Sequence, residues 1–414
     1  MLSVHTSPLA ALGGKETGGM NVYVRELSRE LGRRGIAIDV FTRAQSPTAS
    51  RVDDVELGQG ARVIHITAGP EEPYHTHRVW NHLPEFADGV RRFVREEGLC
   101  YDLFHSHYWL SGWVARELRR DGPAPIIHMF HTLGRMKDRV ARNEAERESR
   151  QRIQVETEIM AFADRIVAAT PHDKVQMMAL YDADPDHIVV IPCGVDLELF
   201  RKIPCQEAKE ELGVPGDHHL VLFVGRIEPL KGIDTLLNAM ALVLEEESGW
   251  RGRVTLCIIG GEIREDAILM DEEMQRLHRL RDELGMADVV IFAGAQAQET
   301  LPCTYSAADV VVVPSHYESF GMVALEAMAC GAPVIASDVG GLSFVVEDGR
   351  TGFLVPERDP PALADRLHRV LADRTLRDVM GIAGIKTAQD YGWPLIADRI
   401  VALYQEVIGG QTGA

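Results

Sequence analysis

The sequence has little cysteine, no long apolar run and no excess of basic charge. Its six cysteines include no C-x-x-C pair, so neither a zinc site nor a disulfide framework is indicated, and reduced thiols in a cytoplasm are expected. No stretch approaches the roughly 18 apolar residues of a spanning helix, and no secretory signal pattern opens the chain. The formal net charge of −19 disfavours a nucleic-acid partner, because phosphate contacts need a basic field. We therefore expect a soluble, cytoplasmic protein in which any phosphate site is basic only locally.

What the sequence does contain is enough apolar material for two cores. At 414 residues, with 46% hydrophobic and 25% charged residues, the chain is globular and too long for one ordinary domain. Short apolar runs that are typical of strands alternate with helical patterns such as residues 20–35, where Gly35 is placed as a C-cap. This alternation predicts βαβ units and parallel sheets. The sequence carries no signal for an oligomeric state.

The strand-like runs fall into two sets, separated by a polar, proline-containing stretch at 194–219. The first set comprises residues 36–42, 61–66, 102–107, 124–131, 164–170 and 187–192, and the second comprises 220–225, 254–261, 287–294, 308–314, 332–337 and 351–355. We predict two doubly wound, Rossmann-like α/β domains, residues 1–195 and 205–390, facing each other across a cleft. An amphipathic helix at 394–408 follows a Trp-Pro break and is expected to return to the first domain.

The loops that follow the strands are the candidate sites, because open parallel sheets bind ligands at the carboxyl ends of their strands. The loop GGKETGGMN (13–21) leads into a helix and would let backbone amides approach a phosphate. It does not fit the dinucleotide pattern G-x-G-x-x-G, and a purely structural turn is an equal alternative. The loop GRIEPLKG (225–232) places Arg226 and Lys231 between a strand and a helix. These two cations can bind one diphosphate. The alternative is that they are an exposed basic pair without a ligand.

The stretch ESFGMVALE (318–326) carries a carboxylate at each end of an apolar run. Buried glutamates need partners, so the pair predicts a cationic or hydroxyl-rich ligand, the alternative being two glutamates on a solvated helix face. We expect a helix to begin near Ser319 or Phe320 with amides that can hold an anion, and Glu326 to lie about two turns into it, ~12 Å along its axis. A nucleoside diphosphate sugar fits this spacing. Its sugar hydroxyls would meet Glu318, its diphosphate the helix start and the two cations, and its ribose the second glutamate.

These motifs resemble those of retaining glycosyltransferase family 4. E-x7-E together with R-x4-K, in the second of two Rossmann-like domains, is typical of this GT-B family, and the resemblance covers nearly the whole chain. Within the family, the first half is most similar to the enzyme that glycosylates inositol phosphate in mycothiol synthesis and to sucrose-phosphate synthases. The stretches that carry this similarity are HTSPL, GGMNVYVRELSRELGRRG, HSHYWLSG, FHTLGRMK and YDADPDHIVVIPCGVDLELF.

The resemblance implies roles for individual residues. The implied catalytic residues are His131, Glu318, Arg226 and Lys231. The implied donor-binding residues are Gly19, Arg226, Lys231, Glu318, Ser319, Phe320, Gly321, Met322, Val323 and Glu326. The implied acceptor-binding residues are Asn21, Arg78, Tyr108, Thr132 and Arg152. Plain structural readings stand beside these, because His131 also fits a hydrogen-bonded core histidine, Tyr108 a cap on the sheet, and Arg152 a partner of Glu156 four residues later.

The sequence departs from its relatives in two places. Where close relatives carry a lysine that binds the acceptor's phosphate, this chain has Thr76, followed by His77 and Arg78. A phosphorylated acceptor is therefore in doubt, although the Arg78 fork also suits phosphate. The chain also begins inside its first expected strand, MLSVHTS, where relatives have a few more residues, so a start codon further upstream is an open alternative.

The family resemblance also implies a mechanism. The cationic loop and the helix dipole would stabilise the departing diphosphate, and the leaving phosphate would take the acceptor proton in a same-face attack that retains configuration. No metal is expected, because no D-x-D carboxylate pair lies at a strand end, and no cofactor is required beyond a UDP- or GDP-sugar as co-substrate. The alternatives are a sugar-nucleotide-binding protein without turnover and a nucleotide-sugar isomerase of the same fold. Acceptor-dependent release of nucleoside diphosphate discriminates among them.

Overall fold

The computed structural model describes residues 1–11, 17–73, 76–262 and 271–411, and contacts divide the chain into two compact units. Unit 1 comprises Met1–Ala10, Gly19–Cys193 and Trp393–Ala414, and unit 2 comprises Ala11–Gly18 and Gly194–Gly392. The long C-terminal helix is therefore part of unit 1. The chain passes from unit 1 to unit 2 at the start of the polar stretch 194–219.

The sheet of unit 1 is built in two parts. The first part has the order β1 (Ile38–Arg43), β3 (Ala61–Ile66), β2 (Val52–Asp53), and the second has the order β4 (Phe104–His107), β5 (Ile126–Met129), β6 (Arg165–Ala168), β7 (Ile188–Val190). Every pairing is parallel except that of β2 with β3. Leu2 bridges Phe41 of β1 and Ser106 of β4 in parallel and so joins the two parts. The first strand expected from the sequence is thus reduced to bridges, because Leu2 alone pairs on both sides within the described residues.

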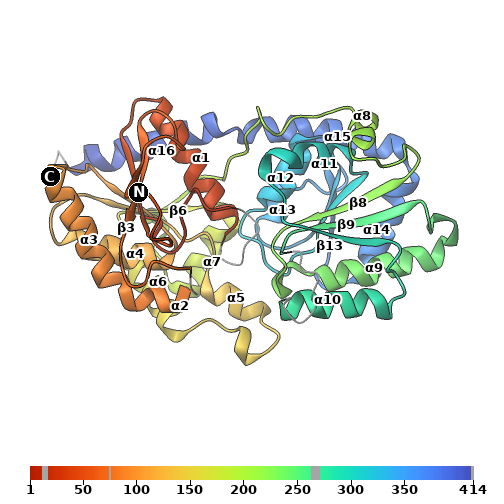
Figure 1. Ribbon diagram of the computed structural model, residues 1–414, viewed down its shortest axis with the longest axis horizontal. Coiled ribbons are helices and arrows are strands. Elements are labelled where there is room, and N and C mark those ends of the chain that lie inside the picture. Colours follow the sequence, from red (N-terminus) through yellow and green to blue (C-terminus); the bar gives the residue numbers. More distant parts are fainter. Residues whose placement is uncertain (12–16, 74–75, 263–270, 412–414) are drawn as a thin grey trace. The chain divides into compact units, whose positions relative to one another are not determined.

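Helices cover both faces of this sheet (Figure 1). They are α1 (Gly19–Arg33), α2 (Thr76–Val79), α3 (Leu83–Glu96), α4 (Tyr108–Arg119), α5 (Gly134–Val140), α6 (Arg150–Phe162), α7 (Pro171–Tyr181) and α16 (Trp393–Gln411), with short 3-10 turns at Trp80–His82, Glu144–Glu146 and Pro185–His187. In α3, the residues Leu83, Phe86, Val90 and Phe93 are buried at helical spacing, so one stripe faces the core. Helix α16 packs on α1, and Tyr404 shares a 2.7 Å hydrogen bond with His105 Nδ1.

The sheet of unit 2 is fully parallel and has six strands. Their order is β10 (Val290–Gly294), β9 (Val254–Ile259), β8 (His219–Val224), β11 (Val310–Val313), β12 (Val334–Ser337), β13 (Gly352–Val355). All four residues of β11 are valines and all are buried, as expected for a strand covered on both faces. The order reverses between β8 and β11, which is where doubly wound sheets open a crevice for ligands.

Figure 1 shows helices on both sides of this sheet. They are α8 (Cys205–Glu211), α9 (Ile233–Glu246), α10 (Glu272–Glu283), α11 (Leu301–Ala307), α12 (Met322–Ala329), α13 (Leu342–Val345), α14 (Pro360–Ala372) and α15 (Arg374–Ala388), with 3-10 turns at Pro229–Lys231, Ser248–Trp250, Gln298–Thr300 and Gln389–Tyr391. Helix α14 packs on α9, and α12 packs on α15. The predicted class, two doubly wound α/β domains, is confirmed.

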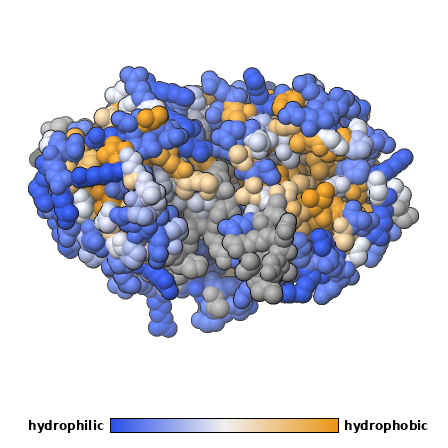
Figure 2. All heavy atoms as spheres, in the orientation of Figure 1, coloured by the Kyte–Doolittle hydropathy of each residue, from blue (hydrophilic) through white to orange (hydrophobic). Residues whose placement is uncertain are grey.

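The surface is mainly hydrophilic on the face seen in Figure 2, where apolar side chains form scattered patches. Within the described ranges, no helix combines the length and the apolar character that crossing a bilayer requires.

Candidate functional site

The candidate donor site of unit 2 lies at the carboxyl ends of β8 and β11, where the strand order reverses. The loops that follow these strands are in close contact. The His316 amide donates to the Leu230 carbonyl at 2.8 Å, and a Cβ on Gly232 (φ +65°) would lie 2.0 Å from the Pro314 carbonyl oxygen. Only glycine fits there, because any side chain would meet main chain. Backbone packing therefore fixes the spacing of the two loops.

Two charged residues from these loops form an ion pair. Lys231 Nζ lies 2.6 Å from Glu318 Oε2, and the two side chains are 18% and 21% exposed. Arg226 pairs in the same way with Glu228, at 2.9 Å, and both of these side chains are about one-third exposed. Neither pair is fully buried, so both cations remain accessible from solvent. An anionic ligand can therefore compete with either carboxylate for its cation.

The helix after β11 begins later than the sequence suggested. The expected start near Ser319 or Phe320 is wrong, because α12 begins at Met322 and its N-cap, Gly321, has a φ of +99°. A left-handed residue does not continue a right-handed helix, so the residues before it form a loop. Glu326 is consequently the fifth residue of α12, roughly 6 Å along the axis from Met322 instead of two turns.

The first turn of α12 offers backbone donors to this site. The amides of Met322 and Val323 have no acceptor within the helix, as in the first turn of any α-helix, and the N-cap residue Gly321 has no side chain that could cap them. Helix N-termini bind anions through such amides and through the helix dipole.

Glu326 is buried, with 7% of its surface exposed. Its carboxylate accepts from the Tyr305 hydroxyl at 2.9 Å and from the Gln298 amide at 3.5 Å. The alternative of two glutamates on a solvated helix face is therefore wrong for this residue. Burial and the nearby Glu326 carboxylate raise the pKa of Tyr305 well above its ordinary value, so the phenol remains a donor.

A glycine pair that the sequence reasoning missed shapes the Glu318 loop. The Gly341 amide donates to the Glu318 carbonyl at 2.8 Å. A Cβ on Gly340 (φ +51°) would lie 2.1 Å from the same carbonyl oxygen, and one on Gly341 would lie 2.3 Å from Phe320 Cα. The signal available in the sequence was the dipeptide GG shortly after the strand-like run 332–337, a position where backbone approaches backbone.

In unit 1, two residues that follow neighbouring strands adopt left-handed backbone conformations. Tyr108, directly after β4, has a φ of +72°, and His131, two residues after β5, has a φ of +60°. Non-glycine residues in this region cost roughly 1–3 kcal/mol each, and such strain is concentrated at functional sites. Both positions lie at the carboxyl edge of the sheet, which is where a parallel sheet is expected to bind ligands.

His131 is held by a second histidine. Its Nε2 lies 3.1 Å from Nδ1 of His107, which is fully buried, and the Tyr23 ring packs edge-on against it. Burial, reinforced by the nearby His5, lowers the pKa of His131 to about 3. The imidazole is therefore neutral at pH 7, and one of its two nitrogens is occupied within the protein.

Asn21 and Gly19 lie at the start of α1. Asn21 is 1% exposed, and its amide donates to Thr6 Oγ1 and to the Ser7 carbonyl, both at 2.7 Å. It therefore anchors the segment that follows the Leu2 bridges. Gly19 is the exposed first residue of α1, so its amide belongs to the first helical turn.

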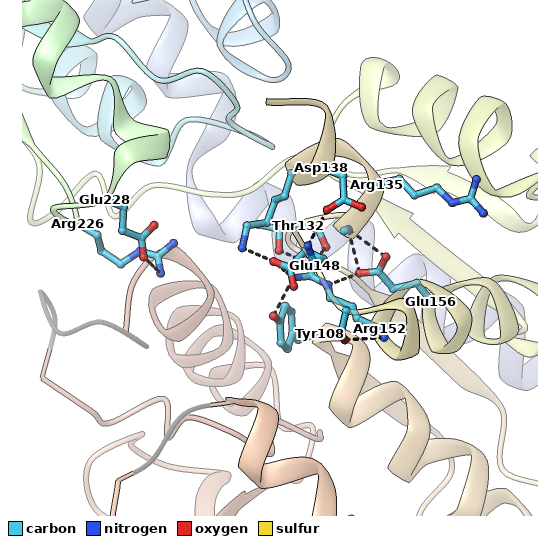
Figure 3. Close-up of polar contacts among 12 residues, drawn as sticks. Tyr108, Thr132, Arg135, Asp138, Glu148, Arg152, Glu156, Arg226 and Glu228 are labelled. Atoms are coloured by element: carbon cyan, nitrogen blue, oxygen red, sulfur yellow. Dashed lines mark hydrogen bonds and ion pairs between the residues drawn. The ribbon is translucent and has the colours of Figure 1, made fainter. Parts of the chain in front are cut away.

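Three residues predicted for the acceptor, Tyr108, Thr132 and Arg152, lie together (Figure 3). Arg152 is 1% exposed and donates to the Tyr108 hydroxyl, the Thr132 carbonyl and the Thr132 hydroxyl, each at 3.0 Å. The structural alternative holds at the same time, because Arg152 Nε also pairs with buried Glu156 at 2.7 Å. The guanidinium thus ties the two left-handed turns to α6.

The remaining predicted positions are described only in part. Arg78 is exposed on α2. The side chains of Thr76 and His77, and residues 13–16 of the glycine-rich loop, lie outside the described part of the chain. Among the residues that the structure describes, no three or more His, Cys, Asp or Glu side chains gather as metal ligands.

Two doubly wound α/β units are the architecture of the GT-B class of glycosyltransferases, and the comparisons with known proteins place the chain in that class. Residues 17–199 match the family model described as Glycosyltransferase Family 4, and residues 205–387 match that of Glycosyl transferases group 1. The chain is 41% identical over 414 residues to the D-inositol 3-phosphate glycosyltransferase of Saccharomonospora viridis, covering all of this chain and 95% of that protein. The chain belongs to glycosyltransferase family 4.

Further similarities agree. The D-inositol 3-phosphate glycosyltransferase 2 of Catenulispora acidiphila is also 41% identical, over 99% of this chain and 94% of its own length. Sucrose-phosphate synthase from Thermosynechococcus elongatus superposes with a TM-score of 0.90 at 36% identity, covering 99% of this chain and 98% of that one. Anabaena HepE, solved with UDP-glucose, has a TM-score of 0.76 at 21% identity over 98% of this chain and 99% of its own, which shows the fold alone.

Proposed function

We propose that this glycosyltransferase moves a hexose-type sugar, with retention of configuration, from a UDP- or GDP-sugar to a hydroxyl of a small polyol, sugar or sugar phosphate. The family and the names of the relatives support sugar transfer. The observation that carries the donor assignment is the Lys231–Glu318 pair at the reversal of strand order in unit 2.

The pair acts as an exchangeable contact in this proposal. A diphosphate brings concentrated negative charge to Lys231, and the α12 amides and Arg226 add donors beside it. When the phosphate takes the ammonium, the Glu318 carboxylate loses its partner and becomes an acceptor for hydroxyls of the bound sugar. The same cation then stabilises the charge that develops on the departing diphosphate.

Other donor contacts follow from the loop geometry. Buried Glu326 accepts from the ribose hydroxyls, while Ser319, Phe320 and Gly321 line the turn into α12. Gly19 contributes its amide to the distal phosphate. His131, which is neutral, hydrogen-bonds the transferred sugar without adding charge. Asn21, Arg78, Tyr108 and Thr132 contact the acceptor in this proposal.

Retention is assigned to a same-face reaction. In this proposal the carboxylates of the site motifs bind hydroxyls of the sugar and the ribose and do not act as nucleophiles. The bond between the sugar and the diphosphate breaks, the acceptor oxygen forms the new glycosidic bond on the same face, and the leaving phosphate oxygen takes the proton of the acceptor hydroxyl. The cations at the leaving group take the electrostatic part that a metal ion has in other transferases.

The test begins with a thermal-shift panel of UDP-, GDP- and ADP-sugars, because a ligand that binds the native state raises its apparent stability. The sugar that stabilises most is then incubated with polyols, sugars and sugar phosphates, and released nucleoside diphosphate is measured. Acceptor-dependent release supports transfer. A rearranged sugar nucleotide without release would indicate an isomerase, and binding without either reaction would indicate a sugar-nucleotide-binding protein.

A further inference from the structure

A carboxylate that the motifs did not include occupies the cationic side of the Arg152 cluster. Glu148 lies 2.9 Å from Arg152 Nη1 and also accepts from the Lys137 ammonium. Figure 3 shows its carboxylate directed at the Arg152 guanidinium, on the side of Tyr108 and Thr132. The Glu148 side chain is 10% exposed, and its amide donates to Asp138 Oδ1 at 2.7 Å, which fixes the backbone at this point.

The two carboxylates on Arg152 differ in their surroundings. Glu156 is fully buried and also accepts from the Gly134 amide and the Tyr181 hydroxyl, so it belongs to the packing of α6. Glu148 reaches the cluster from the segment before α6 and accepts from the two cations. An anionic ligand that bound Arg152 and Lys137 would therefore have to compete with Glu148.

The cluster as it stands is electrically balanced. Arg152 and Lys137 contribute two positive charges, and Glu148 and Glu156 contribute two negative charges. Burial acts to raise the pKa of Glu148, but the charges of Arg152 and Lys137 outweigh it and leave that pKa below its ordinary value. Glu148 is therefore ionised at neutral pH, and the cluster has no surplus positive charge for a phosphate.

We infer that Glu148 determines acceptor specificity: its carboxylate takes the place at Arg152 and Lys137 that an acceptor phosphate would take, so the acceptor is an uncharged polyol or sugar. This inference rests on the proposed function and narrows its acceptor class. A phosphate that entered the cluster would be repelled by the nearby Glu148 carboxylate. It would also find both cations, Arg152 and Lys137, already paired. Charge-assisted contacts of this kind change affinity by roughly tenfold or more.

The experiment removes the charge while keeping the shape. Glu148→Gln leaves an amide oxygen that still accepts from the cations but frees their positive charge. Glu146→Gln is the matched control, because Glu146 lies two residues away and pairs with Arg142 instead. Glu148→Asp keeps the charge on a shorter side chain. Equal thermal unfolding of the four proteins shows that the fold is retained.

The first readout is binding, which does not depend on turnover. Calorimetric titration with inorganic phosphate and with D-inositol 3-phosphate is expected to show at least tenfold tighter binding to Glu148→Gln than to wild type, Glu148→Asp or Glu146→Gln. Equal phosphate affinity for wild type and Glu148→Gln would overturn the inference.

The second readout is the ratio of kcat/KM for inositol to that for D-inositol 3-phosphate. Wild type should favour the unphosphorylated member of the pair, and Glu148→Gln should shift the ratio at least tenfold toward the phosphorylated one. A wild-type preference for the phosphorylated member contradicts the inference. If no variant transfers sugar to any acceptor, the proposed function fails, while the binding result still decides the part of Glu148.

Discussion

The two strand-end sites are built by opposite means. In unit 2, glycines let backbones approach: Gly232 lies against Pro314, and Gly341 lies against Phe320. The charged side chains that these loops carry remain partly exposed. In unit 1, buried polar side chains do the positioning. Arg152 and Asn21 are each 1% exposed, and each makes several hydrogen bonds.

This difference implies that the two units bind their ligands in different ways. Where backbone fixes the geometry, a charged side chain is free to change partners, so unit 2 can exchange a carboxylate for a diphosphate. Where buried side chains fix the geometry, each polar group is committed to its neighbours, and removing one leaves another unsatisfied at a cost of roughly 1–3 kcal/mol. Ligand specificity in unit 1 should therefore follow from which charges are already balanced.

The largest expected effect concerns the exchangeable cations of unit 2. Lys231→Ala and Arg226→Ala should each lower kcat/KM by roughly 100-fold or more, because each removes a contact that stabilises charge on the leaving group. Steady-state release of nucleoside diphosphate measures the loss. Lys386→Ala, which removes an exposed lysine from α15, is the control and should retain activity. Near wild-type turnover in both loop variants would show that Lys231 and Arg226 do not stabilise the leaving group.

The buried histidines of unit 1 make its stability sensitive to acid. Burial lowers the pKa of His105 and of His131 to about 3, below the ordinary value of about 6.5 in an unfolded chain. The unfolded state therefore binds more protons below pH 6.5, and the native state loses stability as the pH falls. Between pH 7.5 and 5.5 we expect a loss of about 1.3 kcal/mol for each histidine. Denaturant unfolding at the two pH values measures this.

The control for this pH dependence is a variant that removes one titrating group. His105→Gln should show a smaller drop in unfolding free energy between the two pH values than wild type does, even if it is less stable at both. An unfolding free energy that does not change between these pH values would mean that the imidazoles bind protons equally well in the folded and unfolded states, and that burial does not lower their pKa.

The backbone-built character of unit 2 can be tested with a single methyl group. A Cβ at position 341 would meet Phe320 Cα and the Ser319 carbonyl oxygen, both at 2.3 Å, so Gly341→Ala must displace the loop that carries Glu318. Overpacking of this kind costs about 1–3 kcal/mol, which we expect to appear as weaker donor binding in calorimetry. Gly249→Ala is the control, because nothing lies within 4 Å of its Cβ position.

The sequence predicted the parts of unit 2 that depend on strand order and missed those that depend on a single backbone angle. The predicted strand 61–66 matches β3, and the predicted run 254–261 contains β9 (Val254–Ile259), since apolar runs suffice to find such strands. The loops after β8 and β11 do follow strands at the reversal of strand order, as predicted; that they bind the donor stays a prediction. The start of α12 was missed because Gly321 adopts a left-handed conformation, which the sequence allows but does not require. The Lys231–Glu318 contact joins residues from separate loops and follows only from the fold.

In unit 1 the sequence analysis missed how the charges around Arg152 are balanced. Pairing of Arg152 with Glu156 was anticipated from the four-residue spacing, and the same spacing on the other side of Arg152 leads to Glu148. Glu148 precedes α6, whose N-cap is Ser149, so the spacing rule for residues within one helix did not point to it. Convergence of Arg152 with Tyr108 and Thr132 rests on left-handed turns that local sequence does not specify.

The two glutamates of unit 2 should respond differently to loss of charge. Glu318→Gln should slow transfer and relax discrimination between sugars, while free nucleoside diphosphate binds as well as before or a few-fold more tightly, because Lys231 loses its competing partner. Glu326→Gln should instead weaken nucleotide binding by roughly tenfold, since a charged acceptor for ribose hydroxyls is lost. Calorimetry with the diphosphate alone compares them. Equal weakening by both variants would mean that the two ends of the donor have been assigned wrongly.

The smallest expected effect is at Thr76, where relatives carry a lysine. Thr76→Lys adds a cation on the acceptor side but leaves Glu148 at its place on Arg152 and Lys137. It should therefore improve kcat/KM for a phosphorylated acceptor only a few-fold. Combination with Glu148→Gln should give more than either change alone, because the double variant adds a cation and also frees the positive charge of Arg152 and Lys137. Arg78→Ala tests whether the exposed Arg78 already binds the phosphate of the acceptor. If wild type prefers a phosphorylated acceptor and Arg78→Ala removes that preference, Arg78 replaces the missing lysine, and the sequence argument from Thr76 is wrong.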